Sequence, residues 1–138
     1  NRSFLRSIHC DLAARNFAYP YGDFSFHSKR RLEGYFDSCR SLLTGVNAGA
    51  ADLGALKACA LQNSAIERQG IMQIVAETVL KNGWLIFTTH DVEPVPSRFG
   101  VTPDLLAFAL NAAFESGCQL VTIGAALRIL GPTRPVGG

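Results

Sequence analysis

The sequence has little net charge and contains no long apolar run. Its 13 basic and 11 acidic residues leave a formal net charge of +2, which is too small to predict binding to nucleic acid or to an anionic membrane surface. No segment approaches the ~18 consecutive apolar residues that span a bilayer. Hydrophobic residues nevertheless make up 48% of the chain, against 17% charged residues, so we expect a folded domain with a buried core.

The sequence also lacks the spacing of a metal-binding cluster. Its cysteines, Cys10, Cys39, Cys59 and Cys118, form no Cys-x-x-Cys pair, which argues against a zinc knuckle. Its three histidines have no partner at ligand spacing either. We interpret the cysteines as buried reduced thiols, with Cys39 on the apolar face of a predicted helix, and this favours a cytoplasmic location. Disulfides would instead require an exported protein.

Helical and strand-like patterns alternate along the chain. Helices are expected over residues 2–14, 27–41 and 66–82, followed by one that begins at 103 and a short last one that ends at about 130. Strands are expected over 16–19, 42–46, 84–88 and 119–123. Residues 47–54 and 89–101 have the composition of loops, and 52–61 is compatible with a short helix or a strand. The alternation predicts an α/β protein with a parallel sheet. A helix over 2–14 would normally follow a strand, so we expect residues 1–14 to be the second half of a unit whose first half is missing.

Two helix ends have clear local signals. Asn82 and Gly83 accept the left-handed conformation that ends a helix. Thr102 is a good N-cap, Pro103 suits the first helical position, and Asp104 lies near the positive end of the helix dipole. These residues predict the end of the helix over 66–82 and the start of the next one.

Two of the expected strands run into segments equipped for chemistry, residues 17–22 and 85–91. Catalytic groups of parallel α/β folds collect at the carboxyl ends of strands. Pro20 restricts its own backbone and pushes Tyr19 toward extended geometry. Such a rigid turn can direct the backbone N–H of Tyr21 into a cavity as an oxyanion donor. The alternative is an ordinary Pro-Tyr-Gly turn with buried aromatic side chains.

His90 follows the apolar run at 84–88 and precedes Asp91. Its imidazole would titrate near neutral pH and is suited to general acid catalysis. The alternative is a histidine that is simply hydrogen-bonded at the end of a strand.

Four segments in order resemble the C-terminal half of the polysaccharide deacetylases. They are Phe-Ala-Tyr-Pro-Tyr-Gly at 17–22, Trp-Leu-Ile-Phe-Thr-Thr-His-Asp-Val at 84–92, Gly-Val-Thr-Pro at 100–103 and Gly-Cys-Gln-Leu-Val-Thr-Ile at 117–123. The resemblance covers roughly residues 16–130. It implies an α/β fold that is the C-terminal portion of a distorted (β/α) barrel of this family, formed by residues 1–130, with a flexible tail at 131–138.

The resemblance implies a metal-dependent hydrolase that removes N- or O-acetyl groups from a carbohydrate. The family uses a divalent metal, usually zinc, held by an Asp and two His, with a second Asp as base. This sequence lacks the family's Asp-Asp and His-x-x-x-His segments, so we expect the ligands upstream and expect this chain alone to be inactive. The implied partners are an acetylated glycan and the missing N-terminal half of the same protein, or other copies of the chain when it is isolated. Two alternatives stay open: a non-catalytic glycan-binding or structural relative, and a metal amidohydrolase of the same fold acting on a non-sugar amide.

By position, the resemblance also assigns roles to individual residues. The backbone N–H of Tyr21 would hold the oxyanion, His90 would protonate the leaving amine as general acid, and Asp91 would orient either the loop or the histidine. The expected substrate-binding residues are Tyr19, Pro20, Trp84 and Thr88.

Two departures from the family pattern concern the same region. Ala18 stands where the family commonly has an Arg that pairs with the base, and Arg40 is a candidate replacement. Thr88 stands where the family often has the Leu that lines the acetyl pocket, which leaves the substrate preference open.

Overall fold

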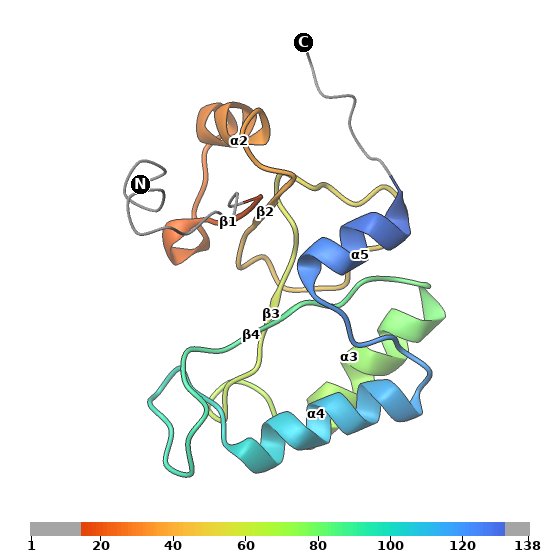
Figure 1. Cartoon of the computed structure of the whole chain (residues 1–138). Helices are drawn as coiled ribbons and strands as arrows, with labels where there is room; N and C mark the ends of the chain where they lie inside the picture. Colours follow the sequence, from red (N-terminus) through yellow and green to blue (C-terminus); the bar gives the residue numbers. More distant parts are fainter. Residues whose placement is uncertain (1–14, 132–138) are drawn as a thin grey trace, which may run out of the picture.

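The computed structural model describes residues 15–131, which form a mixed α/β structure (Figure 1). In chain order its elements are strand β1 (Asn16–Ala18), the short 3-10 helix η1 (Pro20–Gly22), helix α2 (Phe26–Glu33), strands β2 (Ser38–Arg40) and β3 (Cys59–Ala60), helix α3 (Arg68–Leu80), strand β4 (Phe87–Thr88) and helices α4 (Pro103–Glu115) and α5 (Ile123–Leu130). The expected helix over 2–14 and all of the expected tail beyond Gly131 lie outside the described residues.

The strands form a row of parallel segments. β1 pairs with β2 in parallel, with Ala18 opposite Arg40. A parallel bridge between Arg40 and Leu56 continues the row to the segment that leads into β3, and β3 pairs with β4 in parallel. The order in space is therefore β1, β2, the 53–60 segment and β4. Within residues 15–131 this row does not close, so the barrel expected from the resemblance remains a prediction.

The buried side chain of Asn47 joins two of these segments. Its Nδ2 donates to the carbonyls of Lys57 (2.9 Å) and Trp84 (3.1 Å), and its Oδ1 accepts from the Lys57 N–H (2.9 Å). The Asn47 and Trp84 backbones also exchange two hydrogen bonds. The Asn47 amide therefore takes the place of backbone hydrogen bonds between the residues that precede β3 and those that precede β4, because it supplies both a donor and an acceptor.

Apolar side chains of α3 and α4 build the larger core, and these two helices lie side by side in Figure 1. This cluster contains Leu61, Ile71, Val75, Val101, Leu105, Ala109, Ala112 and Ala113. A second cluster on the strand row contains Leu53, Leu56, Ala58 and Ile86. Both clusters include or pack against residues next to β3 and β4, such as Leu61 and Ile86, so the β4 end of the row is supported by packed apolar side chains.

The predicted end of α3 and the predicted start of α4 are confirmed. Asn82 has a left-handed backbone (φ 45°) directly after α3, and the N–H of Gly83 donates to the carbonyl of Thr78 at 2.9 Å. The hydroxyl of Thr102 accepts from the N–H of Leu105 at 3.3 Å, with Pro103 in the first turn of α4.

The predicted helix over 27–41 is wrong beyond Glu33. α2 ends there, the chain turns at Gly34, and Ser38–Arg40 joins the sheet as β2. Cys39 is therefore a fully buried strand residue and not part of a helix face. The spacing of the apolar residues around Cys39 is compatible with a helix, but also with a turn followed by a buried strand. The parallel pairing of Ser38–Arg40 with β1 favours the strand.

Two expected strands are absent from the described chain. Residues 42–46 are irregular, because the strand they were expected to form lies earlier, in β2. Residues 119–123 lead into α5, where the Thr122 hydroxyl accepts from the N–H of Ala125 at 3.2 Å as an N-cap. In the undecided segment 52–61, only Cys59–Ala60 forms a strand, β3.

Two further findings concern chemistry and membranes. In the described chain Cys39, Cys59 and Cys118 are all free thiols, with the first two buried. None of the helices between residues 15 and 131 has the length and apolar character needed to cross a membrane.

Candidate functional site

The two segments singled out by the sequence, 17–22 and 85–91, leave their strands at the same end of the row, where the carboxyl ends of the parallel strands lie. This end of the row is called the strand edge below. Residues 19–22 follow β1 and residues 89–91 follow β4, and the segments between them run in the same direction. Two segments of the row separate β1 from β4, which at about 4.8 Å per spacing places their ends ~14 Å apart in a flat sheet. The two segments therefore lie at the same end of the strand row, and a ligand bound to both would lie across the ends of the strands between them.

Tyr21 has the most unusual backbone of this edge. Its φ of 57° and ψ of 9° lie in the left-handed region, which costs a non-glycine residue about 1–2 kcal/mol. The turn around it is closed by the N–H of Gly22 on the carbonyl of Tyr19 (2.9 Å) and by the N–H of Asp23 on that of Pro20 (3.2 Å). Among residues 15–131 the N–H of Tyr21 itself has no hydrogen-bond acceptor. A strained residue with an unpaired N–H is a feature that often accompanies function.

Gly22 brings this turn against the end of β2. Its φ is +75°, and a Cβ at this position would lie 2.6 Å from both Cβ and Cγ of Leu42 and 2.8 Å from its backbone nitrogen. Only glycine permits both the backbone angle and this close approach. The turn is thus held in place by contact with its neighbour and not only by its own hydrogen bonds.

Tyr19 anchors the turn from the other side. Its side chain is buried, its hydroxyl donates to the carbonyl of Gly54 at 2.9 Å, and its ring stacks on Phe24 at 4.9 Å. Burial, with a smaller contribution from Cys39, raises the pKa of the Tyr19 hydroxyl to about 12. The hydroxyl therefore stays protonated and donates. Its side chain is occupied in the core, so in this structure Tyr19 supports the site and does not present its ring to a substrate.

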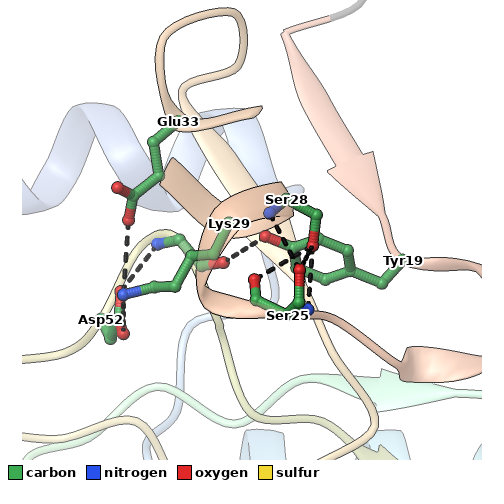
Figure 2. A network of polar contacts seen from close by, with 7 residues as sticks. Tyr19, Ser25, Ser28, Lys29, Glu33 and Asp52 are labelled. Atoms are coloured by element: carbon green, nitrogen blue, oxygen red, sulfur yellow. Dashed lines mark hydrogen bonds and ion pairs between the residues drawn. The ribbon is translucent and has the colours of Figure 1, made fainter. Parts of the chain in front are cut away.

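Figure 2 shows the polar network that continues from this anchor. The N–H of Gly54 donates to Oδ1 of Asp52 (2.9 Å), and Nζ of Lys29 pairs with Oδ2 of Asp52 (2.7 Å) and with Glu33 (3.5 Å). Lys29 and Glu33 lie one turn apart on α2. The network therefore links α2, the 52–54 loop and the tyrosine that precedes the Pro20–Gly22 turn.

His90 lies exposed at the end of β4 and contacts Phe99. The two ring centroids are 5.3 Å apart with the planes inclined by 35°. The N–H of His90 also donates to the carbonyl of Phe99 at 3.2 Å. The imidazole is therefore open to solvent and to a ligand, while its neighbour comes from the loop that follows.

Asp91 holds that loop. Its carboxylate accepts from the N–H of Ser97 at 2.8 Å and from the Ser97 hydroxyl. These two hydrogen bonds, with a smaller contribution from the charge of His90, lower the pKa of Asp91. Of the two roles expected for Asp91, the contacts fit orientation of the loop, since its hydrogen-bond partner is Ser97 and not the histidine ring.

The other predicted site residues are divided between two places. Pro20 is exposed in the turn at the end of β1, and Thr88 is half-buried as the last residue of β4. Trp84 is half-buried before β4 begins, which places it ~13 Å along the strand direction from Thr88. The structure thus brings Pro20, Tyr21, Thr88 and His90 to one edge and leaves Trp84 at the other end.

A cavity of about 960 Å³ lies at that other end. Its walls come from the 47–53 loop, the C-terminal ends of α3 and α4, and α5, and of the predicted site residues Trp84 alone lines it. The cavity reaches β4 at Phe87, but Tyr21, Thr88 and His90 do not line it. We assign the candidate site to the strand edge because the chemical groups are there.

Arg40 lies next to the position where the resemblance leads one to expect a cation. It is the register partner of Ala18 on the adjacent strand, and its Nη1 donates to the carbonyl of Ser41 at 3.4 Å. Register partners of parallel strands project to the same side. Its half-buried side chain therefore lies on the same side of the sheet as that of Ala18.

Two parts of this site were not anticipated from the sequence. The ring of Phe99 and the clamp of Ser97 on Asp91 lie in a stretch that has loop composition and no periodicity. The only local signal is Gly100, where a Cβ would overlap the carboxylate of Asp91. A glycine of this kind indicates a close approach, but it does not identify the group that approaches.

Nowhere in the described part of the chain do three or more His, Cys, Asp or Glu side chains gather in a way that could hold a metal ion. Comparisons with protein-family models, with curated proteins and with solved structures found no match to this chain. The resemblance to polysaccharide deacetylases therefore depends on the sequence motifs alone.

Proposed function

We propose that this chain is the C-terminal part of a polysaccharide deacetylase-type hydrolase that removes N- or O-acetyl groups from a carbohydrate. The observation that supports it most is the turn after β1. The left-handed Tyr21 presents a backbone N–H with no acceptor in the described chain, at the edge where His90 also ends its strand. An ordinary Pro-Tyr-Gly turn has no need of a strained tyrosine, because Gly22 alone could supply the left-handed residue.

Each of the two residues has a separate task in this proposal. The N–H of Tyr21 donates to the oxygen that becomes negative when the acetyl carbonyl is attacked, and removal of one such donor typically costs 10²–10³ in kcat. His90 gives its proton to the nitrogen as the bond between carbonyl carbon and nitrogen breaks, so the product leaves as a neutral amine. General acids of this kind contribute about 10²–10⁴-fold. A divalent metal, zinc by preference, would activate the attacking water, and its ligands would come from outside residues 15–131.

The unpaired outer sides of β1 and β4 in the described chain support the proposal of a partner that completes the sheet. In the described chain β1 and β4 each pair on one side only, and strands with unpaired edges tend to add another strand. We propose that the missing N-terminal half of the same protein fills these edges, with self-association as the outcome for the isolated chain.

The first test is substitution of His90. The longest natural form of the protein that contains these residues is assayed for acetate release from an N-acetylglucosamine oligomer with zinc added. We expect His90→Asn to lower kcat about 10²–10⁴-fold without moving the unfolding midpoint, because the side chain is exposed. His27→Asn is the matched control, since His27 is an exposed residue of α2, and its kcat should not change.

The second test separates the backbone of Tyr21 from its side chain. Tyr21→Gly keeps the N–H and accepts the left-handed angle without strain. We expect this variant to retain most of its turnover. Loss of turnover as large as that of the histidine variant would show that the phenol, 93% exposed in this structure, is the catalytic group and would contradict the oxyanion role.

The same assays distinguish the alternatives. Binding of the oligomer with no acetate release from the unmodified protein, with or without zinc, would favour the non-catalytic relative. Acetate release from a non-sugar acetamide alone would favour the amidohydrolase.

A further inference from the structure

We infer that Phe99 is the positioning residue for the His90 imidazole. The effect of this contact on turnover rests on the proposed function, whereas the contact itself does not. Phe99 contacts the histidine twice, through its ring at a centroid distance of 5.3 Å and through its carbonyl, which accepts the His90 N–H at 3.2 Å. One residue thus restrains both the backbone and the ring of His90.

Phe99 can hold the ring because its loop is closed at the base. The carboxylate of Asp91 accepts two hydrogen bonds from Ser97, and the N–H of Val101 donates to the carbonyl of Asp91 at 2.9 Å. Gly100 packs against the same carboxylate with no room for a Cβ. Residues 91–101 therefore form a compact loop in spite of their length, and the position of Phe99 follows from it.

The outer part of the loop is fixed to the neighbouring strand end. The hydroxyl of Ser64 donates to the carbonyl of Arg98 at 2.7 Å, and the N–H of Asn63 donates to the carbonyl of Gly100 at 3.1 Å. These two bonds flank Phe99 along the chain. They attach the loop to residues that follow β3, so the ring is held relative to the sheet and not only relative to His90.

Burial in a core does not explain Phe99. Its side chain is 46% exposed and it belongs to neither core cluster. The guanidinium of Arg98 lies 5.4 Å from its ring centroid, so a cation and an imidazole share the surface of one exposed aromatic ring. A half-exposed phenylalanine between two polar groups at the end of β4 contributes more to the orientation of His90 than to folding.

The consequence is a restricted imidazole at the rim of the site. General acid catalysis needs the proton within hydrogen-bond reach of the leaving nitrogen, and a displacement of 1 Å can cost about 10²-fold. An exposed histidine with free rotation would meet this requirement only part of the time. Contact with Phe99 removes part of that freedom before substrate binds.

The test is NMR of the full 138-residue chain with ¹³C-labelled histidine. The chain has three histidines, so the loss of one signal in His90→Gln assigns the resonance. We expect the two ring C–H signals of His90 to carry a ring-current shift that Phe99→Ala abolishes and Phe99→Tyr restores. The His27 signals are the internal control and should not move.

A matched variant separates contact from position. Phe99→Leu keeps an apolar side chain without a ring, so the ring-current shift should vanish. The unfolding midpoint of this variant, followed by Trp84 fluorescence, should equal that of Phe99→Tyr. Unchanged His90 shifts in Phe99→Ala or Phe99→Leu would overturn the inference. Should Phe99→Ala fail to fold, the Leu and Tyr variants decide alone.

Activity then separates this inference from the proposed function. In the deacetylation assay we expect Phe99→Ala to lower kcat by up to about 10²-fold, with KM unchanged and rescue by Phe99→Tyr. If the His90 shifts respond as expected while His90→Asn keeps full turnover, the proposed general acid role fails and the positioning contact stands. If His90→Asn is inactive while the His90 shifts do not change in Phe99→Ala or Phe99→Leu, the general acid role stands and the positioning contact fails.

Discussion

Substitution of Gly22 by alanine should destabilise the protein and displace the turn that presents Tyr21. Two physical terms contribute. A φ of +75° costs an alanine about 1–2 kcal/mol. The added Cβ would also lie 2.6 Å from two side-chain carbons of Leu42 and 2.8 Å from its backbone nitrogen, and overpacking of this kind costs about 1–3 kcal/mol. Together they predict a loss of about 2–5 kcal/mol in the free energy of unfolding.

A second glycine isolates the contact from the backbone term. Gly49 has a φ of +61°, but a Cβ added there would meet no heavy atom within 4 Å, so Gly49→Ala should lose only the conformational term of about 1–2 kcal/mol. Both variants gain the same stiffening of the unfolded chain. The difference between them therefore measures the contact of the turn with β2.

Urea unfolding followed by fluorescence provides the assay, because Trp84 is the only tryptophan of the chain. A double-mutant cycle with Leu42→Gly, which removes both carbons that the new Cβ would meet, should recover part of the loss. Equal destabilisation by the Gly22 and Gly49 variants, to within about 0.5 kcal/mol, would refute the reasoning. So would a cycle with no coupling.

Two further predictions concern other parts of the frame. Asn47→Ala should lower the free energy of unfolding by about 2–6 kcal/mol in the same urea assay, because it leaves the N–H and the carbonyl of Lys57 without their amide partner, at about 1–3 kcal/mol each. Asn63→Ala is the control, because this exposed side chain accepts a single backbone N–H, that of Thr102 at 2.8 Å, and its loss should cost about 0.5–1.5 kcal/mol. The lowered pKa of Asp91 means that its bonds to Ser97 stabilise the loop above the ordinary value of 3.8 and are lost as pH falls through the lower folded value. The amide signal of Ser97 should therefore titrate with a midpoint below 3.8 and lose that transition in Asp91→Asn; a midpoint above that value would contradict the assignment.

Local sequence signals predicted helices better than strands. The period of Ile71 and Val75 and the Asn82 stop identified α3, and Thr102 with Pro103 identified the start of α4, because caps and helical periodicity depend on residues close in the chain. Of the four expected strands, those at 16–19 and 84–88 are present in shorter form as β1 and β4, whereas those at 42–46 and 119–123 are not. The stretch around Cys39 became β2 because Asn16–Ala18 pairs with it, and no property of residues 38–40 alone required that.

The candidate site divides in the same way. The chemical identity of Tyr21, His90 and Asp91 and their places after apolar runs could be predicted from the sequence, since they follow the pattern of strand ends. Their neighbours could not: the contact between Gly22 and Leu42 joins residues 20 positions apart, and Phe99 reaches His90 across a loop with no periodic pattern.

By itself, the sequence determined that the chain is α/β, where α3 ends and where α4 begins, and which residues follow β1 and β4, because propensities, caps and periodicity are local. Only the tertiary structure decided that Tyr19 is an anchor, that Asp91 holds a loop, that Trp84 lies away from the other predicted site residues, and that Arg40 faces the position of Ala18. Those outcomes depend on which segments pair and pack, and pairing is settled by the combined burial and hydrogen bonding of residues far apart in the chain.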